Sequence, residues 1–119
     1  MLQKKLRLIK RKEFAYIYKN GETKFYGAVK LYFIPTKLKH ARIGFSVNNK
    51  IGNAVVRNKI KRRMREIIRI NYNLLNPKYN YIFKALTDAP NLNYWQLEEQ
   101  MLCAIKKAKL LVNPNEEKE

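Results

Sequence analysis

The amino-acid sequence predicts an α+β fold: a two-layer α/β sandwich with a sheet of about four mostly antiparallel strands and three helices. Segments rich in aromatic and β-branched residues alternate with segments whose apolar residues recur at helical spacing. The chain has 119 residues, about the length of one domain, and 46% of them are hydrophobic. This composition is enough for one core without disulfides or metals.

The first helix is predicted over 11–20. Phe14, Ile17 and Tyr18 lie at the i, i+3 and i+4 positions of one helical face. Gly21 follows them as a stop signal. We therefore expect this helix to bury one aromatic and aliphatic face.

Two strands are predicted next. The segment 25–35 is rich in aromatic and β-branched residues and ends at Pro35, and 41–47 alternates apolar and polar residues. A polar turn over 36–40 separates them. We expect the two strands to pair as an antiparallel hairpin.

The strongest helical pattern in the chain covers 54–70. Asn53 can cap its first turn. Basic residues lie on the side opposite an apolar stripe at 100° per residue. The apolar stripe consists of Val56, Ile60, Met64, Ile67 and Ile68.

The remaining elements are a strand over 79–87 and a helix over 94–112. The strand is more apolar than the others, so we expect it to be central in the sheet. Asn93 and Gln96 have the spacing of a capping box at the start of the helix. We expect this helix to bury Trp95 and to cover the same face of the sheet as the preceding helix.

The charge is large and unevenly distributed. The net charge is +17, and residues 1–69 carry all of it, whereas 70–119 are neutral overall. Residues 1–10 form a basic arm, and five of the eight arginines lie within 57–69, where Glu66 is the one acid. Such clustering favours a polyanionic partner, nucleic acid first and an anionic membrane surface second.

The sequence offers no catalytic constellation. His40 is the one histidine, and the adjacent Glu98 and Glu99 diverge by about 100° on a helix. Cys103 is the one cysteine and fits a small core residue; no metal spacing or Gly-rich phosphate loop is present. The single cysteine and the lack of a signal-like or membrane-spanning segment favour a reducing, cytoplasmic compartment.

Aromatic residues interleaved with lysines form a second candidate surface. Such platforms hold single-stranded RNA because every base has a face that stacks. Core packing is the competing interpretation. Alternation in the 25–35 strand places Lys30 and Tyr32 on one face, which we expect to be partly open. The aromatic set comprises Phe14, Tyr18, Phe25, Tyr26, Tyr32 and Phe33.

The segment RIGFSVNNKIGNAVVRNKIKRRMREIIR, 42–69, resembles the signature of the bacterial ribonuclease P protein subunit. That pattern is a strand, a K-x-G-N-A-V turn and a helix with R-N-R-x-K-R. LRLIKRKEFAYIYKNG, 6–21, and the strand ending in LYFIP are also similar to that family. Lys59 replaces the second arginine of the triplet, which keeps the charge but loses bidentate geometry.

The resemblance implies a ribosomal-protein-like sandwich with a left-handed βαβ crossover, one RNA-binding domain over 1–113 and a flexible tail over 114–119. It implies the endonuclease subunit that helps a catalytic RNA remove the 5′ leader of precursor tRNA. Mg²⁺ bound mainly by the RNA would carry the chemistry, with no catalytic or metal-binding residue in the protein. The implied catalytic-RNA contacts are Arg57, Asn58, Lys59, Lys61, Arg62 and Arg65, and the implied leader contacts are Phe14, Tyr18, Tyr32 and Lys50.

Three alternatives remain open on the residues alone. A structural RNA-binding protein of ribosomal type would share the basic helix but would need no aromatic cleft. A nuclease acting without RNA is disfavoured by the shortage of acids and histidine. A membrane-surface binder would need bulky apolar anchors beside the cations, whereas Val56, Ile60 and Met64 are better explained as core. The expected partners are therefore the catalytic RNA and the leader, with no membrane and no obligate protein partner.

Overall fold

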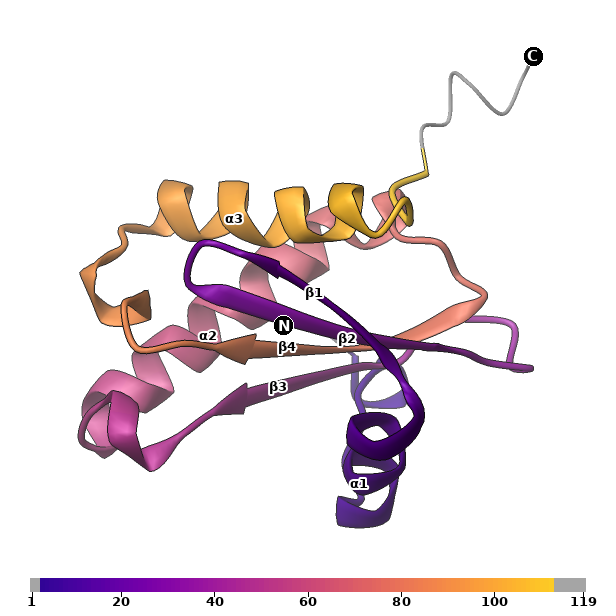
Figure 1. Ribbon diagram of the computed structural model, residues 1–119, viewed down its shortest axis with the longest axis horizontal. Coiled ribbons are helices and arrows are strands. Elements are labelled where there is room, and N and C mark those ends of the chain that lie inside the picture. Colours follow the sequence, from indigo (N-terminus) through magenta and orange to yellow (C-terminus); the bar gives the residue numbers. More distant parts are fainter. Residues whose placement is uncertain (1–2, 113–119) are drawn as a thin grey trace.

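The computed structural model describes residues 3–112, and the expected tail over 114–119 lies outside them. Within this range three helices and four strands form the fold (Figure 1). The helices are α1 (Arg11–Asn20), α2 (Ala54–Asn71) and α3 (Tyr94–Lys107), and the strands are β1 (Glu22–Tyr26), β2 (Val29–Pro35), β3 (Ile43–Val47) and β4 (Tyr79–Ala85).

The strands form one mixed sheet in the order β1-β2-β4-β3. β2 is antiparallel to both β1 and β4, whereas β3 is parallel to β4. The α+β class and the mostly antiparallel sheet are thus confirmed, and β4 is central as expected. The expected hairpin between 25–35 and 41–47 is wrong, because β4 lies between β2 and β3.

The segment predicted as one strand over 25–35 contains the end of β1, a turn at Gly27 and all of β2. Gly27 has a φ of +56°, a left-handed conformation that glycine adopts at little cost. A Cβ atom at this position would lie 2.5 Å from the Gln100 side chain. The Gln100 Oε1 accepts a 2.8 Å hydrogen bond from the Ala28 amide. Gly27 therefore reverses the chain, and β1 and β2 form the true hairpin.

The connection from β3 through α2 to β4 is a βαβ crossover. Parallel neighbours require such a connection because a tight turn cannot join them. In Figure 1 both strands run in the same direction, β4 lies above β3, and α2 passes behind them. This arrangement is left-handed, which is rare among βαβ units, and it confirms the expected crossover.

The two faces of the sheet bury different sets of side chains. On one face, α2 packs against β3 and α3 packs against β1 and β2. The main core there includes Leu31, Phe83 and Ile105, all fully buried. On the other face, α1 covers part of the sheet (Figure 1), and its Ile17 packs with Ile82. The second face remains open beyond α1.

The last helix differs from the expectation in length and orientation. α3 ends at Lys107 rather than 112, and Lys109 follows with a φ of +63°. Its capping box is confirmed, since the Gln96 amide donates to the Asn93 Oδ1 at 2.8 Å. Trp95 is 71% exposed rather than buried. It lies two residues, about 200°, from the buried Leu97, so it points away from the sheet.

Candidate nucleic-acid interface

The N-terminal segment lies along the free edge of β3. Arg7 forms a parallel bridge with Ile43, and the Leu8 amide donates to the Ile43 carbonyl oxygen at 2.9 Å. Because β3 is the last strand of the sheet, this edge would otherwise expose unpaired backbone groups. These backbone contacts with β3 hold the predicted basic arm beside α2, and a groove lies between the arm and the helix.

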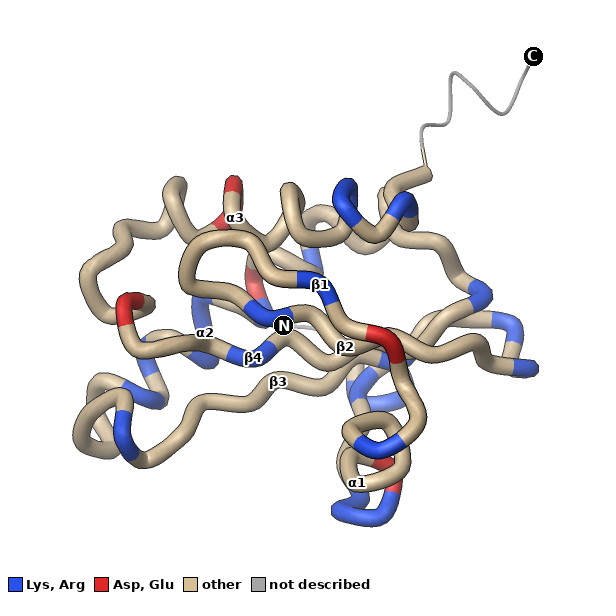
Figure 2. The backbone as a smooth tube through the Cα atoms, in the orientation of Figure 1, with Lys and Arg blue, Asp and Glu red and all other residues tan. Residues whose placement is uncertain are grey.

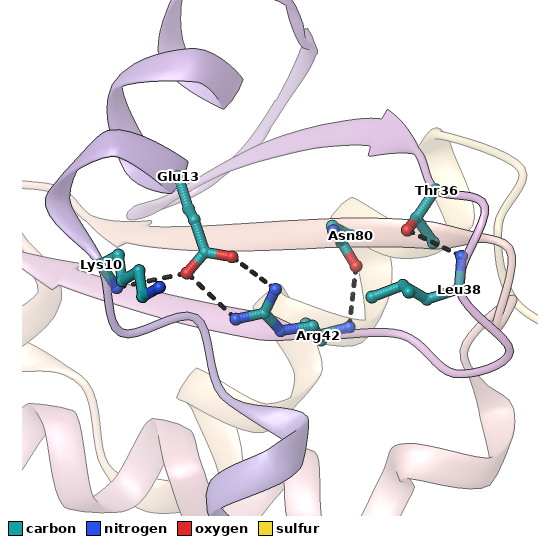
Figure 3. Close-up of polar contacts among 6 residues, drawn as sticks. All are labelled: Lys10, Glu13, Thr36, Leu38, Arg42 and Asn80. Carbon is teal, nitrogen blue, oxygen red and sulfur yellow. Dashed lines mark hydrogen bonds and ion pairs between the residues drawn. The ribbon is translucent and has the colours of Figure 1, made fainter.

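A charged pair anchors α1 to the start of β3 (Figure 3). The Arg42 guanidinium donates two hydrogen bonds to the Glu13 carboxylate, and the Arg42 amide donates to the Asn80 Oδ1 at 3.0 Å. Burial raises the pKa of Glu13, but the bonds from Arg42 and the Lys10 amide outweigh it and hold the pKa below its ordinary value. This pair fixes the position of the aromatic residues of α1 over the sheet.

Asn48 caps the short helical turn in the loop before α2, and Asn53 caps α2 itself. The Asn48 Oδ1 accepts from the Lys50 amide and the Asn53 Oδ1 accepts from the Val56 amide, each at 3.0 Å. The second bond satisfies an amide that the first helical turn leaves without a backbone partner. Lys50, one of the expected leader contacts, is exposed in the short loop that carries β3 into α2.

α2 divides its surface into a buried stripe and two charged flanks. Ile60, Met64, Ile67 and Ile68 face the core, as predicted. Arg57, Lys61 and Arg65 lie on the flank toward β3 and the N-terminal segment, and Asn58 and Arg62 point outward. Lys59 lies on the other flank with Arg63, whose Nη1 donates to the Leu92 carbonyl oxygen at 3.3 Å.

The six expected catalytic-RNA contacts are spread around the exposed part of α2: Arg57, Lys61 and Arg65 share one flank, Asn58 and Arg62 point outward, and Lys59 lies beyond Arg62 on the other flank. Figure 2 shows Lys and Arg positions running along α2 and α1. Helical spacing explains the separation, since residue 59 is about 200° from residues 57 and 61. Because the sequence already predicts a helix here, its 100° spacing is the signal that places Lys59 on a different flank from Arg57.

Two hollows follow the charged flank. One, of about 430 Å³, lies between the N-terminal segment and α2; the other, of about 470 Å³, lies on the outer face of α2. Lys61 and Arg65 line both. The first is walled by Arg7, Leu8 and Ile9 on one side and by Ile43, Phe45 and Phe14 at its base.

Three arginines around this groove hold buried donors without acceptors. The Nε atoms of Arg7, Arg57 and Arg65 are buried and have no hydrogen-bond partner within residues 3–112. Arg57 is held in place by its Nη1, which donates to the Asn49 Oδ1 at 2.5 Å. Buried donors are normally paired. These guanidinium groups thus keep N–H donors that no acceptor within residues 3–112 uses, and charged donors of this kind are suited to an external anion such as a phosphate.

The expected leader contacts on α1 and β2 lie together on the second face of the sheet. The Tyr18 ring contacts the Tyr32 ring edge-on, with centroids 4.8 Å apart, and Phe14 lies 6.3 Å from Tyr18. Phe14 also packs directly on Gly44, where a Cβ atom would lie 2.6 Å from its ring. Tyr18 is 39% exposed but Tyr32 only 8%. Tyr32 is therefore largely covered, contrary to the expectation that it lies on a partly open surface.

A row of polar and aromatic residues continues this face across all four strands. The strand register pairs Phe25 with Lys30, Lys30 with Lys84, and Lys84 with Ser46, so their side chains share one face. The Lys30 Nζ lies 4.8 Å from the Phe25 ring centroid and 4.9 Å from that of Tyr32. Such cation–π contacts position an ammonium beside stackable rings.

Lys84 and Ser46 were missed by the sequence analysis as parts of this surface. Lys84 lies between the buried Phe83 and Ala85. The alternation of residues along β4 could therefore have indicated that Lys84 lies on the opposite face of the sheet from these two. The expected pairing of β2 with β3, however, did not place β4 between them. Only the observed strand order brings Lys30 and Lys84 side by side.

No group of three or more His, Cys, Asp or Glu residues within 3–112 could hold a metal ion. In the same range, no helix has the length and apolar character needed to cross a membrane.

His40 lines a hollow near the N-terminal segment. Cys103 is partly buried on α3 beside Tyr26, and its contact with that phenol raises the Tyr26 pKa.

Comparisons with known proteins agree on one family. The family model described as "Ribonuclease P" matches residues 2–109. The chain is 37% identical to the ribonuclease P protein component of Finegoldia magna, covering 90% of this chain and 94% of that protein. It is 33% identical to the component from Streptococcus agalactiae, covering 92% and 100%.

Solved structures show the same similarity in three dimensions. The Staphylococcus aureus RNase P protein superposes with a TM-score of 0.83 at 31% identity, covering 90% of this chain and 98% of that one. The Thermotoga maritima RNase P protein superposes with a TM-score of 0.79 at 27% identity, covering 85% and 96%. The matched residues include both α2 and the strands of the second face, and the chain therefore belongs to the ribonuclease P protein family.

Proposed function

We propose that this chain is the protein subunit of ribonuclease P. It binds the catalytic RNA through the groove side of α2 and binds the single-stranded 5′ leader of precursor tRNA on the open face of the sheet. In this way it assists endonucleolytic removal of the leader. The cytoplasm is the expected compartment, and no protein partner is required.

The observation that carries the proposal is that the two surfaces meet at Phe14. Phe14 lines the groove beside Lys61 and Arg65, and its ring also contacts Tyr18 on the sheet face. An RNA bound in the groove and a strand bound on the sheet face would therefore lie next to each other. This arrangement suits a subunit that holds a substrate strand against a catalytic RNA.

The proposed role of the groove is electrostatic. Arg57, Lys61, Arg62 and Arg65 can each neutralise a phosphate and release condensed counterions. The guanidinium groups of Arg57 and Arg65 supply directed, charge-assisted hydrogen bonds for such phosphates. Asn58, exposed on the same side, can contact a base edge or a 2′-hydroxyl. Lys59 lies on the other flank, so we propose that it contributes a separate backbone contact.

The proposed role of the sheet face is to hold an unpaired strand by stacking. Tyr18 and Phe25 are 39% and 49% exposed and offer ring faces to bases. Lys30 and Lys84 form a cross-strand pair beside them, and Lys50 lies in the loop after β3, so all three can contact leader phosphates. Like charges directly opposite on adjacent strands are unfavourable unless an anion lies between them.

The proposal assigns the chemistry to the RNA. Hydrolysis of a phosphodiester at this site needs an activated water and stabilisation of the leaving oxygen, which Mg²⁺ supplies. The described residues contain no acid or histidine cluster that fits such an ion. We therefore propose that Mg²⁺ is held mainly by the RNA, and that the side chains of this protein bind and orient both RNAs.

The test is a cleavage assay on precursor tRNA at low magnesium, with protein alone, catalytic RNA alone and the mixture. At low magnesium we expect only the mixture to cleave. At high magnesium we expect the RNA alone to cleave as well. Cleavage by the protein alone would contradict the proposal. Binding of the catalytic RNA with no effect on cleavage would favour a structural RNA-binding protein instead.

A further inference from the structure

A third hollow lies beyond the proposed RNA contacts, at the far end of α2. It has a volume of about 530 Å³, which is in the range of small-ligand sites. Three separate parts of the chain line it. They are the N-terminal segment with Gln3 and Lys5, the loop before β3 with His40, and the end of α2 with the short helical turn after it, which supply Arg69 and Asn73. None of these residues belongs to the surfaces assigned above.

The hollow combines an apolar surface with several kinds of polar group. Leu6 and Tyr72 supply the apolar lining. The Tyr72 hydroxyl donates to the Ala41 carbonyl oxygen at 2.5 Å, which fixes its ring. Gln3 and Asn73 add amides, which can both donate and accept hydrogen bonds, as the edge of a nucleobase requires.

Cations at the same hollow favour an anionic ligand. Lys5 is exposed and Arg69 is half-exposed, with side-chain exposure of 46%. The Arg69 Nε donates to the Glu66 Oε2 at 3.0 Å, and Nη2 donates to Oε1. A guanidinium has five N–H donors, so three remain for another acceptor. Glu66 thus holds Arg69 in place without using all of its donors.

The hollow continues the line of the groove. Lys61, Arg65 and Arg69 follow each other at intervals of four residues and therefore lie on one side of α2. The N-terminal segment forms the opposite wall in both places: Arg7 lines the groove and Lys5 lines the hollow. An RNA strand that leaves the groove along α2 would reach this hollow about one helical turn later.

We propose that this hollow binds one unpaired nucleotide of the catalytic RNA, an inference that rests on the proposed function. The phosphate lies at the rim, between Lys5 and Arg69. The base lies against Tyr72, and the Gln3 and Asn73 amides contact its edge. The helix dipole is negative at this end of α2, so the anion belongs beside the cations at the rim and the base lies deeper.

The first test changes the charge. Lys5→Gln with Arg69→Gln removes two positive charges from the hollow, and Lys106→Gln with Lys109→Gln removes two from exposed positions on the α3 side. We expect the first pair to lower affinity for the catalytic RNA about tenfold and to reduce its salt slope by about 1, because one phosphate contact is lost. The second pair should have much smaller effects. Equal effects of the two pairs would overturn the inference.

The second test leaves the charge unchanged. Gln3→Ala with Asn73→Ala alters exposed positions, and thermal unfolding of the variant checks its fold. Chemical probing of the catalytic RNA should reveal one base that wild-type protein protects and this variant does not, while the rest of the footprint persists. Identical footprints would overturn the inference but leave the proposed function intact. Failure of the wild-type protein to bind the RNA at all would overturn both.

Discussion

The Tyr18 ring lies edge-on to the Tyr32 ring, with centroids 4.8 Å apart and an angle of 79° between the ring planes. Tyr18 is the more exposed of the two, and Tyr32 lies beneath it in the small cluster with Ile17 and Ile82. The two tyrosines therefore have different roles. Tyr18 is accessible to an incoming base, whereas Tyr32 supports Tyr18 and contacts the Lys30 ammonium.

Replacement of Tyr18 by Ala should weaken binding of leader-bearing tRNA to the assembled ribonucleoprotein by about 1–3 kcal/mol, the usual range for losing one base–aromatic stack. Binding of mature tRNA, which lacks the leader, should change little. Affinity measurements with both tRNAs test this. Equal losses for the two substrates would remove the aromatic face as a leader site.

Tyr32→Ala should differ from Tyr18→Ala because Tyr32 is buried. We expect a loss of folding stability of about 3 kcal/mol or more, as for other buried aromatic truncations, together with weaker leader binding. Tyr32→Phe keeps the ring and should preserve both properties. Urea unfolding measures the stability. A Tyr32→Ala variant as stable as wild type would contradict the supporting role given to this ring.

Arg57→Ala and Arg62→Ala should each lower affinity for the catalytic RNA and reduce its salt slope by about 1, because each removes one phosphate contact. Lys106→Ala, on the exposed side of α3, is the matched control and should leave the slope unchanged. The measurement is the RNA dissociation constant over a range of salt concentrations. An unchanged slope for both arginine variants would exclude this side of α2 as the contact surface.

Gly44→Ala should act through Phe14. The added Cβ atom would lie 2.6 Å from the Phe14 ring, so the ring and α1 must shift. Overpacking of this kind typically costs about 1–3 kcal/mol in folding free energy. We expect lower stability in urea unfolding and weaker leader binding, because Tyr18 moves with α1. Unaltered leader affinity in a destabilised variant would show that the position of α1 does not matter for the leader.

The Glu13–Arg42 pair should make stability depend on pH. The pKa of Glu13 is lowered from its ordinary value of 4.5. Because the pKa is lowered in the folded state, the pair stabilises the fold fully above the ordinary value of 4.5. This contribution is lost as the pH falls through the lower folded-state pKa. Glu13→Gln should therefore cost about 1.5–3 kcal/mol at pH 7, the range for hydrogen bonds to charged groups.

The same comparison at low pH provides the control. Wild type and Glu13→Gln should converge in unfolding free energy below the folded-state pKa, because the wild-type carboxyl is then also neutral. Unfolding in urea over a series of pH values measures the difference. A difference that stayed constant from pH 7 to the acid limit would show that the ion pair is not its source.

The local signals in the sequence predict the helices well. The apolar stripe of α2, the Asn53 cap and the Asn93–Gln96 capping box are all confirmed. Each of these features depends on residues only a few positions apart, so the local sequence is enough to predict it. The motif in α2 likewise identified the charged side of that helix, although only the helix geometry shows that Lys59 lies apart from Arg57.

The sheet was harder to predict because its order depends on distant segments. The turn at Gly27 is short and lies within an apolar run, so 25–35 reads as one strand. The pairing of β2 with β4 joins segments about fifty residues apart, and no local pattern indicates it. The burial of Tyr32 depends on where α1 packs on the sheet, and the exposure of Trp95 depends on which side of α3 faces the sheet.

The most direct test of the two-surface proposal is the affinity of the assembled ribonucleoprotein for precursor tRNA as the leader is lengthened one nucleotide at a time. We expect the affinity to rise over the first several nucleotides and then level off once the sheet face is covered. The catalytic RNA alone should show no such rise. The same affinity for mature tRNA and for every leader length would contradict the account.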